Sequence, residues 1–303
     1  MAHRNQHENK LYAGIEAGGT KFNCVIGTSP TNVIARASFP TTKPQETIAK
    51  TSNFFIEQSQ IHGELASLGL ACFGPVDLHK GSATYGYITA TPKPHWSNCD
   101  VLGQYENALS IPVAFDTDVN GAALGEHLYG AAQDVDDFVY VTIGTGIGGG
   151  VFSNGRPLNG LVHPEVGHML VSLDKEQRSF DSICPFHNNC LTSVAAGPAI
   201  KARWKKAGHE LPEDHEAWDL EAYYLAIMCM NLTLCFSPAR IILGGGVMKQ
   251  SQLYPKVRQQ FKDLMNGYML PPISLDDYIV APGLSDQAGE AGALALAEGL
   301  ITS

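Results

Sequence analysis

Three glycine clusters, each next to a strand-like apolar run, constrain the fold of this chain most strongly. They lie at Gly18–Gly19, Gly144–Gly150 and Gly244–Gly246. Glycine lets backbone N–H groups come close to a ligand and point toward it, which suits a phosphate. A hairpin or packing turn would explain any one cluster alone. Two clusters between expected strands, followed by one between a strand and a helix, favour a nucleotide-binding α/β protein.

Part of the second cluster, Gly144–Gly149, matches the G-x-G-x-x-G dinucleotide fingerprint. That fingerprint has to open a helix, because the pyrophosphate lies on the helix N-terminus. Here a short apolar stub follows, and then Asn154-Gly155, which is a hairpin signal. The context therefore disfavours an NAD-dependent oxidoreductase. A Walker A loop is disfavoured as well, since the chain contains no Gly-Lys dipeptide.

The length of 303 residues predicts two domains of about 150 residues each. The expected boundary lies near residue 117, giving an N-terminal α/β domain (1–117) and a C-terminal α/β domain (118–303). A unit of strand, glycine turn and strand recurs at 12–26 and 139–152, which hints at an internal duplication. The chain is 44% hydrophobic and 17% charged, so it can bury a core and is not disordered.

Charge and cysteine usage exclude several classes of protein. Thirty acidic against 20 basic residues give a formal charge of -10, which argues against general nucleic-acid binding. No apolar run is long enough to span a bilayer, and residues 1–13 lack the apolar stretch of a secretion signal. Seven cysteines, an odd number, argue against a disulfide framework. We therefore expect a cytoplasmic protein without a membrane partner.

The hydrophobic pattern predicts alternating strands and helices along the chain. Residues 11–40 indicate a hairpin-led sheet, and residues 74–98 a long loop of the kind that is usually functional. Residues 154–190 are rich in loops and hold most of the histidine and cysteine. Residues 65–73 and 111–118 are further expected strands, 138–152 a strand, a glycine turn and another strand, and 239–248 a strand that meets a glycine turn. The expected helices are 45–61, 119–130, 251–265 and 288–300, and residues 197–235 are expected to be mainly helical.

Asp118 is the candidate general base. It lies at the end of an expected strand, with Asn120 beside it, where a carboxylate can accept a proton from a substrate hydroxyl. The alternative is that Asp118 is the N-cap of the following helix. Asp116 has no helix-start position and is expected to be structural. Glu16, just before the first glycine cluster, could hold a Mg²⁺-bound water or be a solvated strand residue.

The segment Cys184-Pro-Phe-His187-Asn-Asn-Cys190 places three soft metal ligands three residues apart. One tight loop with this spacing can wrap a zinc ion, and His168 would complete a tetrahedral set of two cysteines and two histidines. His163 is a rival fourth ligand. A loop with cysteines there by chance is the alternative. A zinc with four protein ligands is structural and would stiffen the loop rather than take part in chemistry.

Together these segments resemble the ROK family of sugar kinases in the actin-like ATPase superfamily, and within it the zinc-containing bacterial fructokinases. The resemblance extends from Leu11 to Leu300. The matching segments, in chain order, are GIEAGGTKF (14–22), FGPVD (73–77), TYGYITATPKPHW (84–96), FDTDVNGAALGE (115–126), TIGTGIGGG (142–150), HPEVGH (163–168), CPFHNNC (184–190) and LGGGVM (243–248).

The resemblance implies an actin-like ATPase (ribonuclease H-like) fold, with two α/β domains around a central cleft and the last helix packing back on the N-terminal domain. It implies a homodimer that transfers phosphate from ATP, with Mg²⁺ and a structural Zn²⁺, to D-fructose at C6. Asp118 would be catalytic. The implied sugar contacts are Glu165, His168, Asn120 and Gly74. The implied nucleotide contacts are Gly18, Gly19, Thr20, Lys21, Thr145, Gly146, Gly148, Gly244, Gly245 and Gly246.

One position departs from the family pattern. Members usually have Cys-Leu-Glu, with the glutamate touching the sugar, where this chain has Cys190-Leu191-Thr192. We expect a weaker hold on the sugar, unless Thr192 points away from it. Mannose, glucose and N-acetylmannosamine are the rival substrates. A ROK-type repressor is a remote alternative, because it needs a helix-turn-helix ahead of the kinase core and only about a dozen residues precede the first phosphate loop, GIEAGGTKF (14–22).

Overall fold

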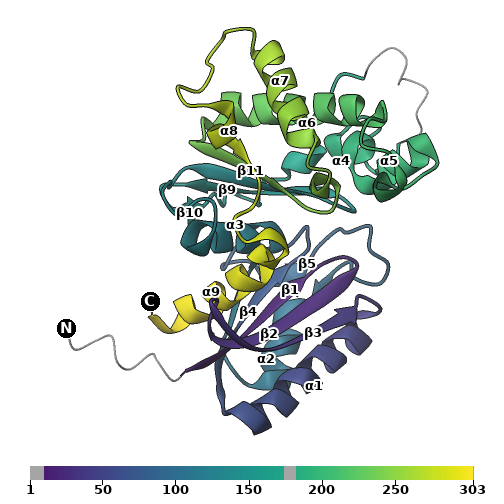
Figure 1. Ribbon diagram of the computed structural model, residues 1–303. Helices are drawn as coiled ribbons and strands as arrows, with labels where there is room; N and C mark the ends of the chain where they lie inside the picture. Colours follow the sequence, from purple (N-terminus) through teal and green to yellow (C-terminus); the bar gives the residue numbers. More distant parts are fainter. Residues whose placement is uncertain (1–9, 174–181, 303) are drawn as a thin grey trace. The chain divides into compact units, whose positions relative to one another are not determined.

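The computed structural model describes residues 10–173 and 182–302, which form two compact units (Figure 1). The first unit comprises the chain up to Gly130, together with Asn159–His163 and the residues from Gln287 onward. The second unit comprises Ala131–Leu158 and Pro164–Asp286. Residues 1–9, the larger part of the polar stretch in which we expected no signal sequence, lie outside the described residues. No helix among the described residues is long and apolar enough to cross a membrane.

The first unit is built on a five-stranded sheet in the order β3-β2-β1-β4-β7. Strands β1, β2 and β3 form an antiparallel meander, while β4 pairs parallel with both β1 and β7. A two-stranded sheet pairs β5, which lies within the loop predicted at residues 74–98, with β6, which begins directly after it. The elements are β1 (Leu11–Ala17), β2 (Lys21–Ser29), β3 (Asn32–Pro40), α1 (Pro44–His62), β4 (Leu65–Cys72), β5 (Tyr87–Ile88), β6 (Cys99–Asp100), α2 (Val101–Leu109), β7 (Val113–Thr117), α3 (Asp118–Tyr129) and α9 (Ala288–Thr302).

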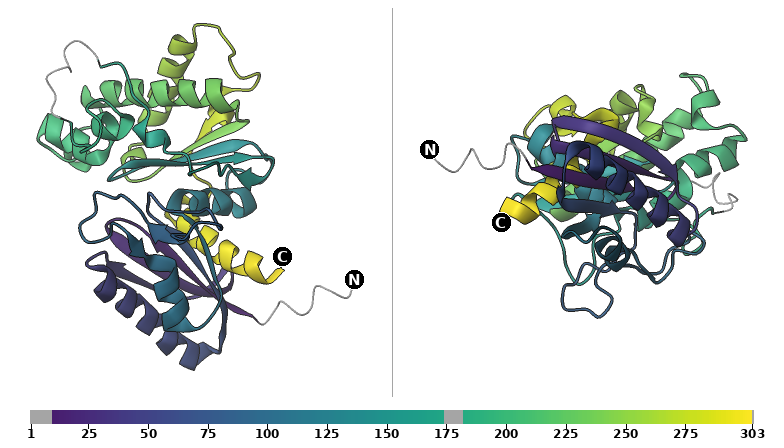
Figure 2. Two further views of the ribbon diagram at one scale, coloured as in Figure 1. Left: turned by 180° about the vertical axis from the view of Figure 1, so that it is seen from behind. Right: turned by 90° about the horizontal axis from the view of Figure 1, so that it is seen from below.

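Successive side chains of β1 enter different cores, as the two-residue period of a strand requires. Leu11, Ala13 and Ile15 belong to the core that includes residues of α1 and α2. Tyr12 packs instead with Leu294 of α9. The sheet is therefore covered on both faces (Figures 1 and 2).

Helix α9 packs tightly against the sheet. A Cβ atom at Gly69 of β4 would lie 1.8 Å from the carbonyl oxygen of Ala293, so only glycine fits there. Ser67 of the same strand donates a 2.7 Å hydrogen bond to the carbonyl of Ala297. This contact joins residues 230 positions apart. It makes the last helix part of the first unit.

The division into units differs from the sequence-predicted boundary at residue 117. Helix α3, which begins at Asp118, packs against α9 so closely that a Cβ at Gly292 would meet the carbonyl oxygen of Gly121 at 1.6 Å. The first unit therefore continues through α3 to Gly130. Asp118 belongs to this unit and not to the second one.

The second unit is built on a sheet in the order β10-β9-β8-β11-β12. Strands β8, β9 and β10 are antiparallel neighbours, while β11 pairs parallel with both β8 and β12. The elements are β8 (Phe138–Ile143), β9 (Ile147–Ser153), β10 (Arg156–Pro157), η1 (Val166–His168), α4 (Leu191–Ala195), α5 (Gly197–Trp204), η3 (Gly208–Glu210), α6 (Ala217–Phe236), β11 (Arg240–Gly244), η4 (Val247–Lys249), α7 (Leu253–Met265), α8 (Leu275–Tyr278), β12 (Ile279–Val280) and η5 (Ser285–Gln287), which ends where the first unit resumes.

One large core holds the second unit together. It joins Val139 and Val141 of β8 and Leu243 of β11 to buried side chains of α4, α5, α6 and α7. Trp218 of α6 is fully buried in it and donates a 2.7 Å hydrogen bond to the carbonyl of Pro212. Helices α6 and α7 cover this face of the sheet (Figure 1).

The two sheets share one strand order and one pattern of directions. In each, three antiparallel strands are followed by two parallel ones, and a glycine turn joins the first strand of the unit to the second. The repeat of strand, glycine turn and strand that the sequence contains therefore extends to a repeat of topology. Both glycine-rich turns are hairpins, which confirms that Gly144–Gly149 does not open a helix.

Candidate active site and metal cluster

The first glycine turn joins β1 to β2 and is exposed at Gly19, Thr20 and Lys21. Its backbone is closed by a 2.9 Å bond from the N–H of Gly18 to the carbonyl of Lys21. Thr41 holds it from outside, since its hydroxyl donates to the Gly18 carbonyl at 2.7 Å. A Cβ at Gly19 would meet no atom within 4 Å. The turn therefore presents a fixed backbone, a hydroxyl and a cation to open space.

The second glycine turn joins β8 to β9. Thr145 and Gly146 are exposed, and a Cβ at Gly144 would meet no atom within 4 Å. The carbonyl of Gly144 accepts a 2.8 Å bond from the N–H of Gly197, the first residue of α5. Gly148 is half-buried at the start of β9. This turn is thus open on one side and anchored to the helical part of the second unit on the other.

The third glycine turn follows β11 and precedes η4. Gly245 has a φ of +89°, and a Cβ there would lie 2.5 Å from the carbonyl oxygen of Ile143 at the end of β8. Only glycine is accommodated at this position. Gly244 is buried, whereas Gly246 is exposed with no atom within 4 Å of its Cβ position. The second and third turns therefore lie side by side in the second unit.

Asp118 is the first residue of α3 and is half-buried. The N-cap of this helix is Thr117, whose hydroxyl accepts a 3.0 Å bond from the N–H of Asn120. Asp118 is therefore not the N-cap that the alternative interpretation suggested. Its Oδ1 accepts a 2.9 Å bond from the N–H of Val119. The carboxylate is thereby oriented at the carboxyl end of β7.

Asp116 and Asn120 form a buried pair beside Asp118. Oδ1 of Asp116 accepts bonds of 2.7 Å from both the side-chain amide of Asn120 and the N–H of Thr117. Burial raises the pKa of Asp116, and these two hydrogen bonds and the nearby His163 oppose the rise. The amide of Asn120 also lies 3.5 Å from Oδ1 of Asn159. The Asp116 carboxylate therefore orients the side chain of Asn120, and its expected structural role stays a prediction.

His163 lies in the first unit and takes no part in the metal cluster. Its Nε2 accepts a 3.1 Å bond from the N–H of Val76, so this ring nitrogen is occupied. A Cβ at Gly74 would lie 3.3 Å from Cε1 of His163, so Gly74 packs against the ring. His163 therefore holds the 74–76 loop, and it is not the fourth ligand that the sequence left open.

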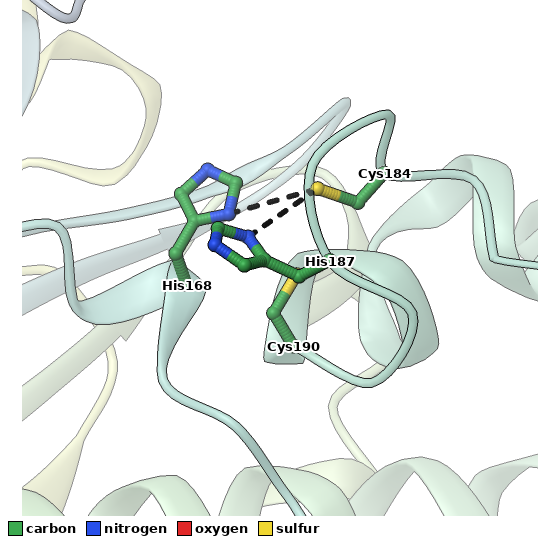
Figure 3. Close-up of side chains that lie close together, drawn as sticks. All are labelled: His168, Cys184, His187 and Cys190. Carbon is green, nitrogen blue, oxygen red and sulfur yellow. Dashed lines mark hydrogen bonds between the residues drawn. The ribbon is translucent and has the colours of Figure 1, made fainter.

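Glu165 and His168 flank η1 in the second unit. Glu165 is exposed at the N-cap, and its carbonyl accepts a 2.9 Å bond from the N–H of His168. His168 is half-buried, with Nδ1 directed toward Cys184 (Figure 3). The short helix therefore presents an exposed carboxylate at one end and a metal-type ligand at the other.

Four side chains form the cluster expected from the sequence: His168, Cys184, His187 and Cys190 (Figure 3). Sγ of Cys184 lies 3.8 Å from Nδ1 of His168 and 3.8 Å from Nδ1 of His187. One ligand atom from each of the four residues lies within 4.8 Å of all the others. Both cysteines are buried, whereas His187 is exposed.

The donor set and its spacing fit a tetrahedral zinc ion. Zinc–ligand bonds of about 2.3 Å to sulfur and about 2.0 Å to nitrogen hold those atoms about 3.6 Å apart. The observed 3.8 Å separations are close to this. Ser182 supports the loop, since its hydroxyl donates to the carbonyl of His187 at 2.8 Å and accepts from the N–H of Cys184 at 3.1 Å. The spacing of cysteines and histidines gave no signal for this serine.

Thr192 follows the cluster on α4, and its hydroxyl contacts the backbone of Ile147 at the second glycine turn. Oγ1 lies 3.2 Å from the nitrogen and 3.4 Å from the carbonyl oxygen of Ile147. The side chain is half-buried. The hydroxyl at position 192, where the resemblance leads us to expect a glutamate, is therefore engaged with the glycine turn.

Glu16 is half-buried in β1. Its Oε2 accepts a 2.8 Å bond from the side-chain amide of Asn23 on β2. A Cβ at Gly289, near the start of α9, would lie 2.3 Å from Cδ of Glu16. The carboxylate is thus packed between β2 and α9, and it is not a fully solvated strand residue.

The two sheets share one topology. They carry two glycine hairpins, a glycine turn before a short helix, an aspartate at a strand end and a Cys₂His₂ cluster. The model of the ROK family matches residues 12–299 of this chain. The chain belongs to the ROK family. Its two α/β units accordingly have the actin-like ATPase (ribonuclease H-like) fold that the sequence predicted.

Curated members of the ROK family include proteins similar to this chain over nearly its whole length. A fructokinase of Pediococcus pentosaceus is 44% identical over 292 residues, covering 96% of this chain and 99% of that protein. A fructokinase of Zymomonas mobilis is 43% identical over 295 residues, covering 96% and 98%. A ROK glucokinase from Streptomyces griseus, solved with glucose and AMPPNP, shares the fold with a TM-score of 0.78 and 22% identity, covering 95% and 99%.

Proposed function

We propose that this protein is a fructokinase, which transfers the γ-phosphoryl group of ATP to the C6 hydroxyl of D-fructose. The observation that carries the proposal is the identity of 43–44% to curated fructokinases over 96% of the chain. Because of this identity, we assign the glycine turns and Asp118 of this chain to the functional parts of a sugar kinase. The active site needs groups that hold phosphates, a base for the hydroxyl and donors that orient the sugar.

Asp118 is the proposed general base. The carboxylate would accept the proton of the C6 hydroxyl while that oxygen forms its bond to the γ-phosphorus and the bond to the β,γ-bridging oxygen breaks. The bond from the N–H of Val119 fixes one oxygen of this carboxylate at the start of α3. Asn120 would orient a sugar hydroxyl, because Asp116 holds its amide group in one position.

The nucleotide would be held by the backbone of the glycine turns. Gly18–Lys21 offers N–H groups, the Thr20 hydroxyl and the Lys21 ammonium to phosphate oxygens. Thr145, Gly146 and Gly148 offer the same kind of backbone in the second unit. Gly244–Gly246 would admit the adenosine against the chain. Mg²⁺ bound with the nucleotide supplies positive charge that stabilises the transferred group.

Glu165 and His168 are the proposed sugar contacts of the second unit, and Gly74 is a further one in the first. Their support is the family resemblance of HPEVGH and FGPVD, together with the exposure of the Glu165 carboxylate. The cluster of His168, Cys184, His187 and Cys190 would hold a structural Zn²⁺. Four protein ligands leave no open position on the metal, so its contribution would be to fold the 182–190 loop.

A kinase acting on mannose, glucose or N-acetylmannosamine is the second candidate. The observation that favours it is Thr192, where the family usually has a sugar-contacting glutamate. A change at a sugar contact alters selectivity more readily than it alters the reaction. A homodimer, a cytoplasmic location and the lack of nucleic-acid and membrane partners stay predictions.

The proposal is tested by following the product itself. The purified protein is incubated with ATP, Mg²⁺ and fructose, and fructose 6-phosphate is detected with phosphoglucose isomerase and glucose-6-phosphate dehydrogenase. A control without fructose measures background ATP hydrolysis. We expect fructose 6-phosphate in a one-to-one ratio with ADP. ADP release without this product would contradict phosphorylation at C6.

A further inference from the structure

Ile147 is the first residue of β9 and directly follows the exposed part of the second glycine turn. Its side chain is buried, and its backbone is hydrogen-bonded by Thr192 of α4. The Thr192 hydroxyl accepts from the N–H of Ile147 at 3.2 Å and donates to the carbonyl of the same residue at 3.4 Å. A hydroxyl can act as donor and acceptor at once. Thr192 therefore bonds both the N–H and the carbonyl of Ile147, at the base of the turn.

Two further contacts hold the same turn. A Cβ at Gly167 would lie 1.7 Å from the carbonyl oxygen of Ile147, so η1 is pressed directly against the base of the turn. The N–H of Gly197 donates to the carbonyl of Gly144 at the opposite end, at 2.8 Å. The turn is thus fixed by two chain segments, one around residue 167 and the other at residues 192–197.

Those two segments are joined to each other at the metal cluster. His168 follows Gly167, and Cys190 lies two residues before Thr192. Between the ligands, Leu170 and Cys190 form an antiparallel bridge, and the N–H of Leu191 donates to the carbonyl of Met169 at 3.0 Å. The cluster therefore links the two chain segments, around residue 167 and at residues 192–197, that contact the second glycine turn.

We propose that Thr192 is a positioning residue for the phosphate-binding backbone of Thr145–Gly148, and that through it the Cys₂His₂ cluster governs nucleotide affinity. This inference rests on the proposed function, because it assumes that the second glycine turn binds ATP. It assigns position 192 of this chain to the nucleotide and not to the sugar. A glutamate cannot reproduce both bonds, because an ionised carboxylate accepts hydrogen bonds but cannot donate one to the Ile147 carbonyl.

The test compares Thr192→Val, which removes the hydroxyl at nearly constant shape, with Thr192→Ser, which keeps the hydroxyl. The full-length, metal-loaded proteins are titrated with AMPPNP and Mg²⁺ by calorimetry in the absence of sugar. The matched control is Thr233→Val. Thr233 is a buried threonine of the same unit whose hydroxyl bonds the carbonyl of Cys229 and the hydroxyl of Tyr278. Neither bond reaches a glycine turn, so its loss should lower thermal stability alone.

We expect Thr192→Val to weaken AMPPNP binding by about three- to tenfold, the effect of losing a neutral hydrogen bond. Thr192→Ser and Thr233→Val should bind as the wild type does, and the KM for fructose should not change in Thr192→Val. Wild-type affinity in Thr192→Val would overturn the inference. A rise in the fructose KM without a change in AMPPNP affinity would also overturn it, because position 192 would then serve the sugar.

A wild-type measurement covers the case in which Thr192→Val does not fold. Hydrogen exchange of the unliganded protein should show the Ile147 amide protected, because it donates to the Thr192 hydroxyl. An unprotected Ile147 amide would contradict the inference without any variant. If the wild type binds no AMPPNP at all, the proposed kinase function itself fails, which is a different outcome from equal binding by the wild type and Thr192→Val.

Discussion

Oδ1 of Asp116, in β7, lies 2.7 Å from the side-chain nitrogen of Asn120, in α3, and both side chains are buried. The same oxygen accepts from the N–H of Thr117. One buried carboxylate thus fixes the rotamer of Asn120 and the backbone that leads into Asp118. Asp116 thus positions both a proposed sugar contact and the backbone that carries the proposed base.

The free energy of unfolding of Asp116→Asn, relative to that of the wild type, should increase as the pH rises. Burial raises the pKa of Asp116 in the folded state above its value in the unfolded chain. The folded wild type therefore loses stability as the pH rises from the ordinary aspartate pKa through this raised value. Asparagine cannot ionise, and its oxygen can still accept both hydrogen bonds. The difference in the free energy of unfolding between variant and wild type should grow by about 1.4 kcal/mol for each pH unit between the unfolded-state and folded-state pKa of Asp116.

Urea unfolding of both proteins between about pH 3.5 and pH 8 measures this difference. The free energy of unfolding of the variant, relative to wild type, should increase with pH and then become constant. A difference that is independent of pH would mean that Asp116 has the same pKa in the folded and unfolded chains.

Asp118→Asn should lower kcat for fructose by about 10²- to 10⁴-fold, the usual effect of removing a general base. The amide keeps the size of the side chain and can still accept from the N–H of Val119, so AMPPNP affinity should be retained. Asp214→Asn, at an exposed position of the second unit, is the control and should have wild-type kcat. Turnover of fructose by Asp118→Asn at the wild-type rate would remove Asp118 from the catalytic role.

Cys190→Ser should abolish metal binding, because it removes a buried ligand of the four-residue cluster. Elemental analysis should find about one zinc per chain in the wild type and almost none in the variant. Thermal stability and AMPPNP affinity should both fall, since the cluster would no longer link the two chain segments that contact Ile147. Cys235→Ser changes an exposed cysteine outside the cluster and should keep the metal. Full activity in a wild-type preparation free of zinc would contradict a required metal.

Thr192→Glu restores the residue usual in the family and separates two roles for this position. The structure engages Thr192 with Ile147, so the substitution should weaken AMPPNP binding and leave the KM for fructose unchanged. Calorimetric titration with AMPPNP gives the first constant, and initial-rate kinetics with fructose varied give the second. A fructose KM that falls several-fold would show that position 192 faces the sugar.

Local patterns in the sequence predicted most of the elements. Apolar runs between glycine turns indicated β1, β4, β8 and β11 because buried parallel strands need continuous apolar residues. The three-residue spacing of Cys184, His187 and Cys190 indicated the metal cluster because its ligands come mostly from one short loop. In both cases the sequence pattern lies within one short segment of the chain.

Contacts between distant residues explain what the sequence did not predict. Helix α3 joins the first unit through its packing on α9, and the bond between His163 and Val76 spans 87 residues. Thr192 and Ile147 are 45 residues apart, and neither has a neighbour that indicates the other. Such contacts depend on how elements pack, and a single sequence carries no periodic signal for them.

The most direct test of the account is a coupled assay of ADP release with fructose, mannose, glucose and N-acetylmannosamine, each with ATP and Mg²⁺ at matched concentrations. Its readout is kcat/KM for each sugar, because this ratio measures discrimination between substrates. The account predicts turnover with the highest kcat/KM for fructose. A higher kcat/KM for another hexose would contradict the assignment to fructose, and the absence of ADP release with every sugar would contradict the kinase function.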